Sequence, residues 1–194
     1  MPHPYLPFYE LLVYDTHLSA GTLISIIRSQ QTFLNPKYQL KTQAILSFSV
    51  RKLNSTFYNG PVMRVRRDSD GQLADLYCDQ DGFERALFLV SSASNLTTRH
   101  SIQQWIAGSR VYLQIWYDQT GRNMIQRQYL HEKQPLVHLM RLQGYPQIYF
   151  YEGSYLDNLV ALVIHDFTFL IHADFSAPRY NYQRLLYLEV RKSA

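Results

Sequence analysis

The segment 60–71 reads Gly60-Pro-Val-Met-Arg-Val-Arg-Arg-Asp-Ser-Asp-Gly71, an extended run between a Gly-Pro step and an Asp-Gly turn. Gly-Pro resets the chain direction, and Asp-Gly is typical of the turn that ends a strand. The same pattern returns in 110–121, Arg-Val-Tyr-Leu-Gln-Ile-Trp-Tyr-Asp-Gln-Thr-Gly, and in 147–153, Gln-Ile-Tyr-Phe-Tyr-Glu-Gly. Three strands that each end in a turn predict a mainly β, antiparallel fold.

Further elements follow from apolar periodicity. The segment 166–173 is almost entirely apolar or β-branched and predicts a buried strand, and 184–191 predicts another. Apolar residues near helical spacing predict a helix over 42–54, and Ser101 to Gly108 carries helix start and stop signals. The segment 18–31 fits a helix or a strand, because its β-branched residues satisfy neither period.

The composition suits one globular domain. The chain has 194 residues, of which 46% are hydrophobic and 18% charged, with sixteen Tyr and ten Phe. The formal net charge is +4, and the basic residues are scattered except around Arg64 to Arg67, which disfavours a nucleic-acid partner. A single cysteine, Cys78, excludes an intramolecular disulfide framework. The longest apolar run, Leu159 to Ile164, is too short to predict a transmembrane helix.

The first residues do not look like a secretory signal. They carry no basic segment before their apolar residues and are interrupted by Pro2, Pro4 and Pro7. We therefore expect synthesis inside the cell without a signal peptide. A soft boundary near Asn35-Pro36-Lys37 separates a Pro- and Tyr-rich segment from the rest.

Three motifs, in order, resemble one known family. They are 49–71, with its Tyr-Asn-Gly-Pro turn and Val-Arg-Arg-Asp-Ser-Asp strand end; 116–122, Trp-Tyr-Asp-Gln-Thr-Gly-Arg; and 144–157, which ends a strand in a Glu-Gly turn. The pattern is similar to the sandwich domain of the α-L-arabinofuranosidase B type, a relative of the concanavalin A-like lectins and glucanases. The residues that carry the motifs are Gly60, Pro61, Arg64, Arg66, Arg67, Asp70, Trp116, Tyr117, Asp118, Gln119 and Gly121.

The resemblance covers about residues 46–175 and implies a jelly-roll or concanavalin A-like sandwich, shortened relative to the family, with two or three short helices. It divides the chain into an N-terminal arm or accessory segment, 1–45, and a lectin-like sandwich, 46–194. If strands are missing, their exposed edges must be covered by another chain or by the protein's own N-terminal segment.

The motif residues also have an architectural interpretation. Arg64 and Arg66 share one strand face and Arg67 lies on the other, so either framework ion pairs or an acidic-ligand patch is conceivable, and framework pairing is the stronger interpretation. Trp116 and Tyr117 lie in an apolar strand, where core packing is favoured over sugar stacking. We expect the Asp118 carboxylate to cap its turn.

Catalysis is not expected. A retaining glycosidase needs two carboxylates about 5 Å apart, and the late acids Asp174 and Glu189 stand in no context like that of the enzymes. A metal or other cofactor is also not expected, because His165 and His172 are seven residues apart and face opposite sides of a strand. Cys78 has acidic neighbours that disfavour a reactive thiolate.

The sequence therefore predicts a non-catalytic structural or assembly protein. The resemblance makes a virion component, such as a minor capsid protein of a large DNA virus, the expected setting, with residues 1–14 as an extended arm that orders on a partner chain. One alternative is a carbohydrate-binding module that stacks sugars on Tyr145, Tyr151 and Tyr155. The other is a residual α-L-arabinofuranosidase-like glycosidase.

Overall fold

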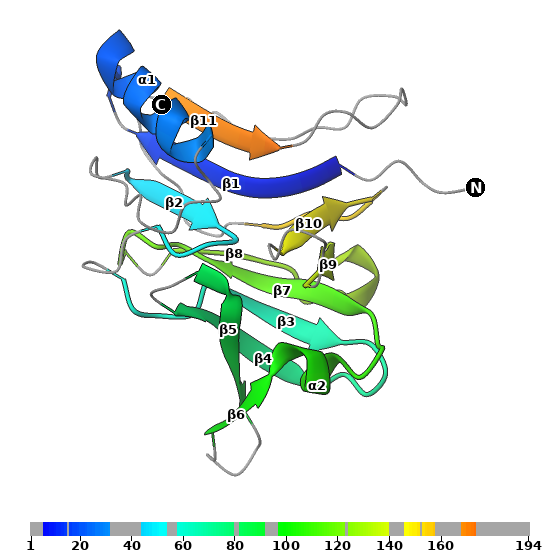
Figure 1. The fold of residues 1–194 in the computed structure, drawn as a ribbon. Coiled ribbons are helices and arrows are strands. Elements are labelled where there is room, and N and C mark those ends of the chain that lie inside the picture. The colour runs from blue at the N-terminus through cyan, green and yellow to red at the C-terminus, as the bar shows by residue number, and fades with distance from the viewer. Residues whose placement is uncertain are drawn as a thin grey trace.

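The computed structural model describes residues 6–14, 16–31, 44–53, 58–79, 82–91, 97–122, 124–139, 146–151, 153–157 and 168–173. Within these ranges, eleven strands pair in antiparallel fashion, which confirms the predicted mainly β fold (Figure 1). The strands are β1 (Leu6–Tyr14), β2 (Leu46–Ser49), β3 (Met63–Arg67), β4 (Leu73–Asp79), β5 (Gly82–Ser91), β6 (Thr97–Ser101), β7 (Val111–Tyr117), β8 (Ile125–Arg127), β9 (Leu136–His138), β10 (Gln147–Phe150) and β11 (Thr168–Ala173). The helices are α1 (Ala20–Gln31), α2 (Ile102–Ile106) and the 3-10 turn η1 (His131–Lys133).

The main path of the sheet runs β11-β1-β10-β9-β7-β3-β4-β5-β6. At β1 the path divides, because one edge of this strand serves two partners. Leu6 to Phe8 pair with β10, whereas Glu10 to Val13 pair with β2. Between the two sets, Tyr9 is an extra residue against β11, which makes a β-bulge at the point of division.

A second division occurs at β7. The start of this strand bonds to β9 through Tyr112, and its end bonds to β8 from Ile115 onward. Gln114 lies between them and is an extra residue against β3, so a bulge again marks the division. The bulge also breaks the alternation of inward and outward side chains, which is why all four residues from Leu113 to Trp116 are buried.

The two routes from β1 to β7 enclose the main hydrophobic core. One route passes through β10 and β9, and the other passes through β2, whose Ser47 carbonyl accepts a hydrogen bond from the Gln119 N–H at 2.8 Å. Phe48 of β2 is fully buried and packs on Trp116, with ring centroids 5.7 Å apart. The result is sandwich-like, with two layers sharing one core.

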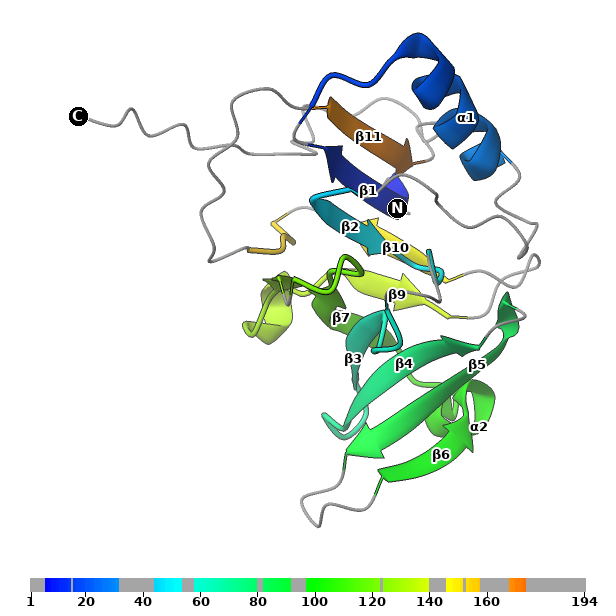
Figure 2. The same ribbon diagram turned by 90° about the vertical axis from the view of Figure 1, so that its left-hand side faces the viewer.

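Helix α1 covers the opposite end of the molecule from α2 (Figure 2). The open choice for 18–31 is thus resolved as a helix, because Ile26 buries its side chain with Leu12, Tyr14 and Leu53 in a second apolar cluster. Helix α2 confirms the helix predicted within 101–108. Gly108, with a φ of +79°, lies two residues beyond the end of α2.

The predicted strands ending at Asp70-Gly71, Gly121 and Gly153 are confirmed as β3, β7 and β10. The helix predicted over 42–54 is wrong: where the structure describes this segment, 44–53, it holds β2. Every residue of β2 is buried. The apolar residues fall near helical spacing only because both faces of this strand are buried. Its two polar residues, Ser47 and Ser49, form hydrogen bonds inside the protein.

The strand predicted over 166–173 is confirmed as β11, but its described side chains, those of Thr168, Leu170 and Ile171, are half-buried. The expected full burial is therefore wrong, because β11 stands at one end of the strand order. The predicted strand 184–191 lies outside the described residues.

The interpretation of 1–14 as an extended arm needs correction where the chain is described. Leu6 to Tyr14 form β1, inside the sheet between β11 on one side and β10 and β2 on the other. Leu12, Val13 and Tyr14 are buried. The N-terminal segment thus pairs within its own chain, while the domain boundary at residue 45 stays a prediction. Among the described helices, none is long and apolar enough to cross a membrane.

Replacing Phe48 by Ala should leave a cavity between the two layers and lower the free energy of unfolding by about 3–5 kcal/mol. Chemical denaturation with two spectroscopic probes measures this. Ile24→Ala is the control, because Ile24 is 49% exposed on α1 and its loss should change stability by less than about 0.5 kcal/mol. Equal losses in the two variants would contradict this placement of the core.

Candidate functional site

The Gln119 side chain holds the chain that follows β2. Its amide nitrogen donates to the carbonyls of Ser49 (3.2 Å) and Arg51 (2.8 Å), and its amide oxygen accepts from the Leu53 N–H (2.9 Å). Gln119 is 3% exposed. A single buried amide therefore replaces three hydrogen bonds that a neighbouring strand would otherwise supply.

Asp118 does more than the turn capping expected of it. One of its carboxylate oxygens, Oδ1, accepts from the Thr120 N–H (3.1 Å) within the turn and from the Ser47 N–H (2.8 Å) of β2. Trp116 adds a third attachment, because its indole N–H donates to the Ser49 carbonyl at 3.1 Å. The Trp-Tyr-Asp-Gln motif thus binds β2 to the end of β7.

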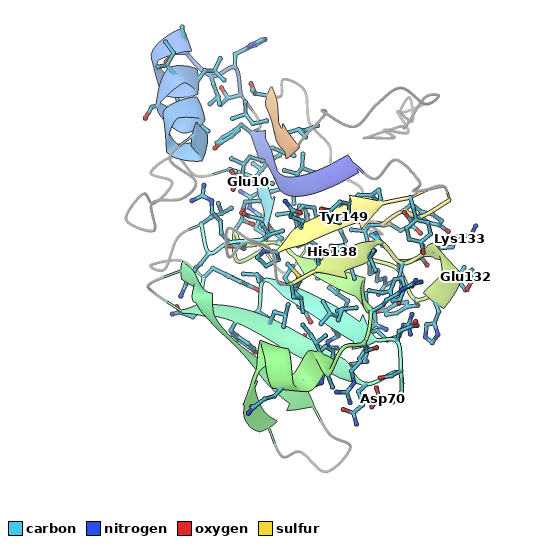
Figure 3. The ribbon with its side chains drawn as sticks, turned by 45° about the vertical axis from the view of Figure 1, so that its right-hand side comes forward. Glu10, Asp70, Glu132, Lys133, His138 and Tyr149 are labelled. Atoms are coloured by element: carbon cyan, nitrogen blue, oxygen red, sulfur yellow. The ribbon has the colours of Figure 1, made fainter. Side chains whose placement is uncertain are left out.

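A buried acid that sequence reasoning missed lies at the division of β1. Glu10 is fully buried, and its Oε2 accepts from Ser49 Oγ (3.0 Å) and Arg51 Nε (3.2 Å) (Figure 3). Burying a carboxylate is costly unless a cation and hydrogen bonds compensate. The available signal was a lone Glu in the apolar run Leu6–Tyr14, but its partner Arg51 is 41 residues away and shares no local pattern with it.

Arg64 lies in a salt bridge on the sheet. Its Nε and Nη2 donate to the two oxygens of Asp75 on the neighbouring strand, at 2.8 and 2.6 Å. The Tyr117 hydroxyl donates to the same carboxylate at 3.0 Å. Both carboxylate oxygens of Asp75 therefore accept hydrogen bonds from the chain itself.

Arg66 and Arg67 also bond within the chain. Arg66 donates from Nε to the fully buried Gln134 (2.8 Å) and stacks on the Tyr112 ring at 5.0 Å. Arg67 donates twice to Asp70, at 2.9 and 2.5 Å, and stacks on Trp105 at 5.1 Å. Asp70, beside the guanidinium, has its carboxyl pKa lowered by the Arg67 hydrogen bond.

The Tyr-Asn-Gly-Pro turn requires a glycine at position 60. The Tyr58 hydroxyl donates to the Pro61 carbonyl at 2.7 Å, so the ring folds over Gly60. A Cβ at Gly60 would lie 2.5 Å from that hydroxyl oxygen. Burial raises the pKa of Tyr58 well above its usual value, and the charges of Tyr77, Asp118 and Asp75 raise it further.

The predicted sugar-stacking tyrosines differ in their surroundings. Tyr145 lies outside the described residues. Tyr151 is half-buried and its hydroxyl donates to the Gln134 carbonyl at 2.9 Å, whereas Tyr155 is 41% exposed. The structure adds Tyr129, 53% exposed, and Leu130, 54% exposed, which sequence reasoning missed.

The remaining candidates form no site in the described ranges. No group of three His, Cys, Asp or Glu side chains there could hold a metal ion. His172 is described only by its backbone, which pairs with Glu10, and Cys78 lies in β4. His165, Asp174 and Glu189 lie outside the described residues.

No family model, curated protein or solved structure matches this chain. The resemblance therefore depends on the three motifs alone. It remains a prediction.

Gln119→Leu keeps the side-chain volume but leaves the Ser49 and Arg51 carbonyls and the Leu53 N–H without that partner. The Ser49 carbonyl keeps the Trp116 N–H, so the loss falls on the Arg51 carbonyl and the Leu53 N–H. At about 1–3 kcal/mol for each buried group, the free energy of unfolding should fall by at least about 2 kcal/mol. Arg122→Ala, an exposed change three residues away, is the matched control. A loss no larger than the control's would contradict the role given to Gln119.

Tyrosine ionisation provides a pH test. Burial raises the pKa of Tyr14, Tyr58 and Tyr117, so their neutral forms are favoured in the folded state. The negative charge of Glu10 raises the pKa of Tyr14 further, and that of Asp75 raises the pKa of Tyr117 further. Their contribution to stability is complete below the ordinary tyrosine pKa of about 10 and is lost as the pH rises above it.

In an absorbance titration at 295 nm, part of the tyrosinate signal should therefore appear only when the chain unfolds in alkali. Tyr117→Phe should reduce this late fraction. In guanidinium chloride the late fraction should vanish, and its persistence there would show that folding is not its cause.

Proposed function

We propose that the chain is a non-catalytic structural or assembly protein built on a lectin-like β-sandwich. A minor capsid component of a virion is the setting that the motif resemblance implies. The observation that supports this proposal is the use of the described carboxylates near the core: each is engaged by the chain's own donors.

Glu10 is bonded by Ser49 and Arg51, and Asp118 by Ser47 and Thr120. Asp75 accepts from Arg64 and Tyr117. A hydrolytic carboxylate must instead face a substrate and exchange protons with it. The motif residues thus carry structural bonds, which favours a role exercised through surfaces.

The strand order offers such surfaces at its ends. Among the described strands, β6 pairs only with β5 and β11 only with β1. An edge strand can accept a further strand from another chain, which would join copies or different proteins without any catalytic group.

A second candidate is carbohydrate binding, and the exposed rings of Tyr155 and Tyr129 favour it. An exposed tyrosine face can stack on the apolar face of a sugar ring. This surface needs no cofactor.

The test combines one measurement on the native particle with two on the full chain. Cross-linking and mass spectrometry of the particle that contains the chain in its native source should find it at fixed stoichiometry with other chains, cross-linked through β6 or β11. A glycan array and hydrolysis of an aryl arabinofuranoside should both be silent. Recovery only as a free chain would contradict the assembly role; array binding lost in Tyr155→Ala would establish the second candidate instead.

A further inference from the structure

Three large apolar side chains are exposed on two backbone segments that adjoin each other beside η1. Of the four described large hydrophobic residues that are strongly exposed, three, Tyr129, Leu130 and Tyr155, come from the segments 127–133 and 153–157. We call these three side chains, with the charged residues between them, the tyrosine patch. Scattered single exposed residues are ordinary, whereas several on adjoining segments point to a contact site.

The backbone under the patch is firmly held. Arg127 and Asp157 exchange two backbone hydrogen bonds, each 2.9 Å, and the Tyr155 N–H donates to the Lys133 carbonyl at 3.1 Å. The fully buried Gln134 anchors the loop from below, since its amide donates to the Gln128 carbonyl at 2.9 Å. A surface ordered in this way loses little entropy when it docks.

Charged side chains of both signs surround the apolar ones. Arg127 stacks on the Tyr129 ring at 5.1 Å, and the Lys133 ammonium lies beside Gly153. Glu132 and Lys133 lie at the outer margin of the molecule, far from Glu10 (Figure 3). Within the described part of the chain, none of Arg127, Lys133, Glu132 and Asp157 forms a salt bridge.

Four other described arginines differ from Arg127 in this respect. Arg51, Arg64, Arg66 and Arg67 each pair with a carboxylate of their own chain. The patch therefore combines an apolar centre with two cations and two carboxylates that have no ion partner among the described residues. In a two-fold symmetric contact the same patch faces itself, so a patch that carries both signs can place opposite charges together.

We propose that the tyrosine patch docks on the same patch of a second copy of this chain. Tyr129, Leu130 and Tyr155 of the two copies form the centre of the contact, and Arg127 and Lys133 of one copy face Glu132 and Asp157 of the other. Tyrosine and arginine are the residues enriched in such contacts. The exposed aliphatic Leu130 suits a protein surface better than a sugar. The inference rests on the proposed assembly role and names one partner for it.

A charge-exchange experiment tests this contact. Light scattering coupled to size exclusion, over a series of concentrations, measures the dimer dissociation constant of the full chain. Arg127→Asp and Asp157→Arg should each raise this constant about tenfold or more, because each variant places like charges together twice. An equimolar mixture of the two variants should restore the dimer, since each mutated residue then faces its opposite charge at both symmetric positions.

Two further variants keep the test independent of folding. Arg122→Asp makes the same charge change at an exposed arginine outside the patch and should leave the dimer unchanged. Leu130→Asp, at a side chain 54% exposed, should prevent dimerisation while the thermal melt stays cooperative.

A chain that is monomeric at every concentration, or a mixture no more dimeric than its two components, would overturn the proposal. So would binding of a soluble glycan that is lost in Leu130→Asp. None of these results would affect the assembly role itself, because the stoichiometry of the native particle is measured separately.

Discussion

Two β-bulges determine how the rest of this chain packs. Tyr9 in β1 and Gln114 in β7 mark the points where one strand edge passes from one partner to another. A bulge bends its strand and strengthens the local twist, so the sheet can divide into two layers over one core. The same division turns the carbonyls at the end of β2 toward side chains instead of a strand. Since a buried backbone group without a partner is costly, polar side chains must enter the interior there.

The buried polar residues follow from that requirement. Gln119 and Asp118 form hydrogen bonds with backbone groups of β2 and of the chain that follows it. Glu10 and Arg51 form a buried ion pair next to them. A buried ion pair contributes little net stability because desolvation offsets the attraction, but losing one partner leaves an uncompensated charge. The pair therefore ties β1 to the chain after β2 across the predicted boundary at residue 45. The N-terminal strand and the motif region depend on each other.

The residues that hold the fold together differ from those exposed on its surface. The residues of the first two motifs bond to backbone groups and to side chains of their own chain, so they stabilise the framework. Residues around η1 and at the end of the third motif, 153–157, carry the exposed apolar side chains and the charges without ion partners among the described residues. Contact surfaces need exposed groups whereas frameworks need satisfied ones, so the first two motifs serve the framework and the end of the third, at Tyr155 and Asp157, reaches the exposed surface.

Local chemistry in the sequence was sufficient for the strands that end in glycine turns and for α2. Turn residues and caps act over three or four positions, so 60–71, 110–121 and 101–108 could be interpreted without knowledge of the fold. The segment 44–53 could not, because burial on both faces removes the alternation that distinguishes a strand from a helix. The tertiary structure alone decided that Glu10 meets Arg51, that Gln119 bonds to the chain after β2, and that the segments 127–133 and 153–157 adjoin each other. These pairings join residues tens of positions apart, and chain closure over such distances depends on the whole packed sheet rather than on any local pattern.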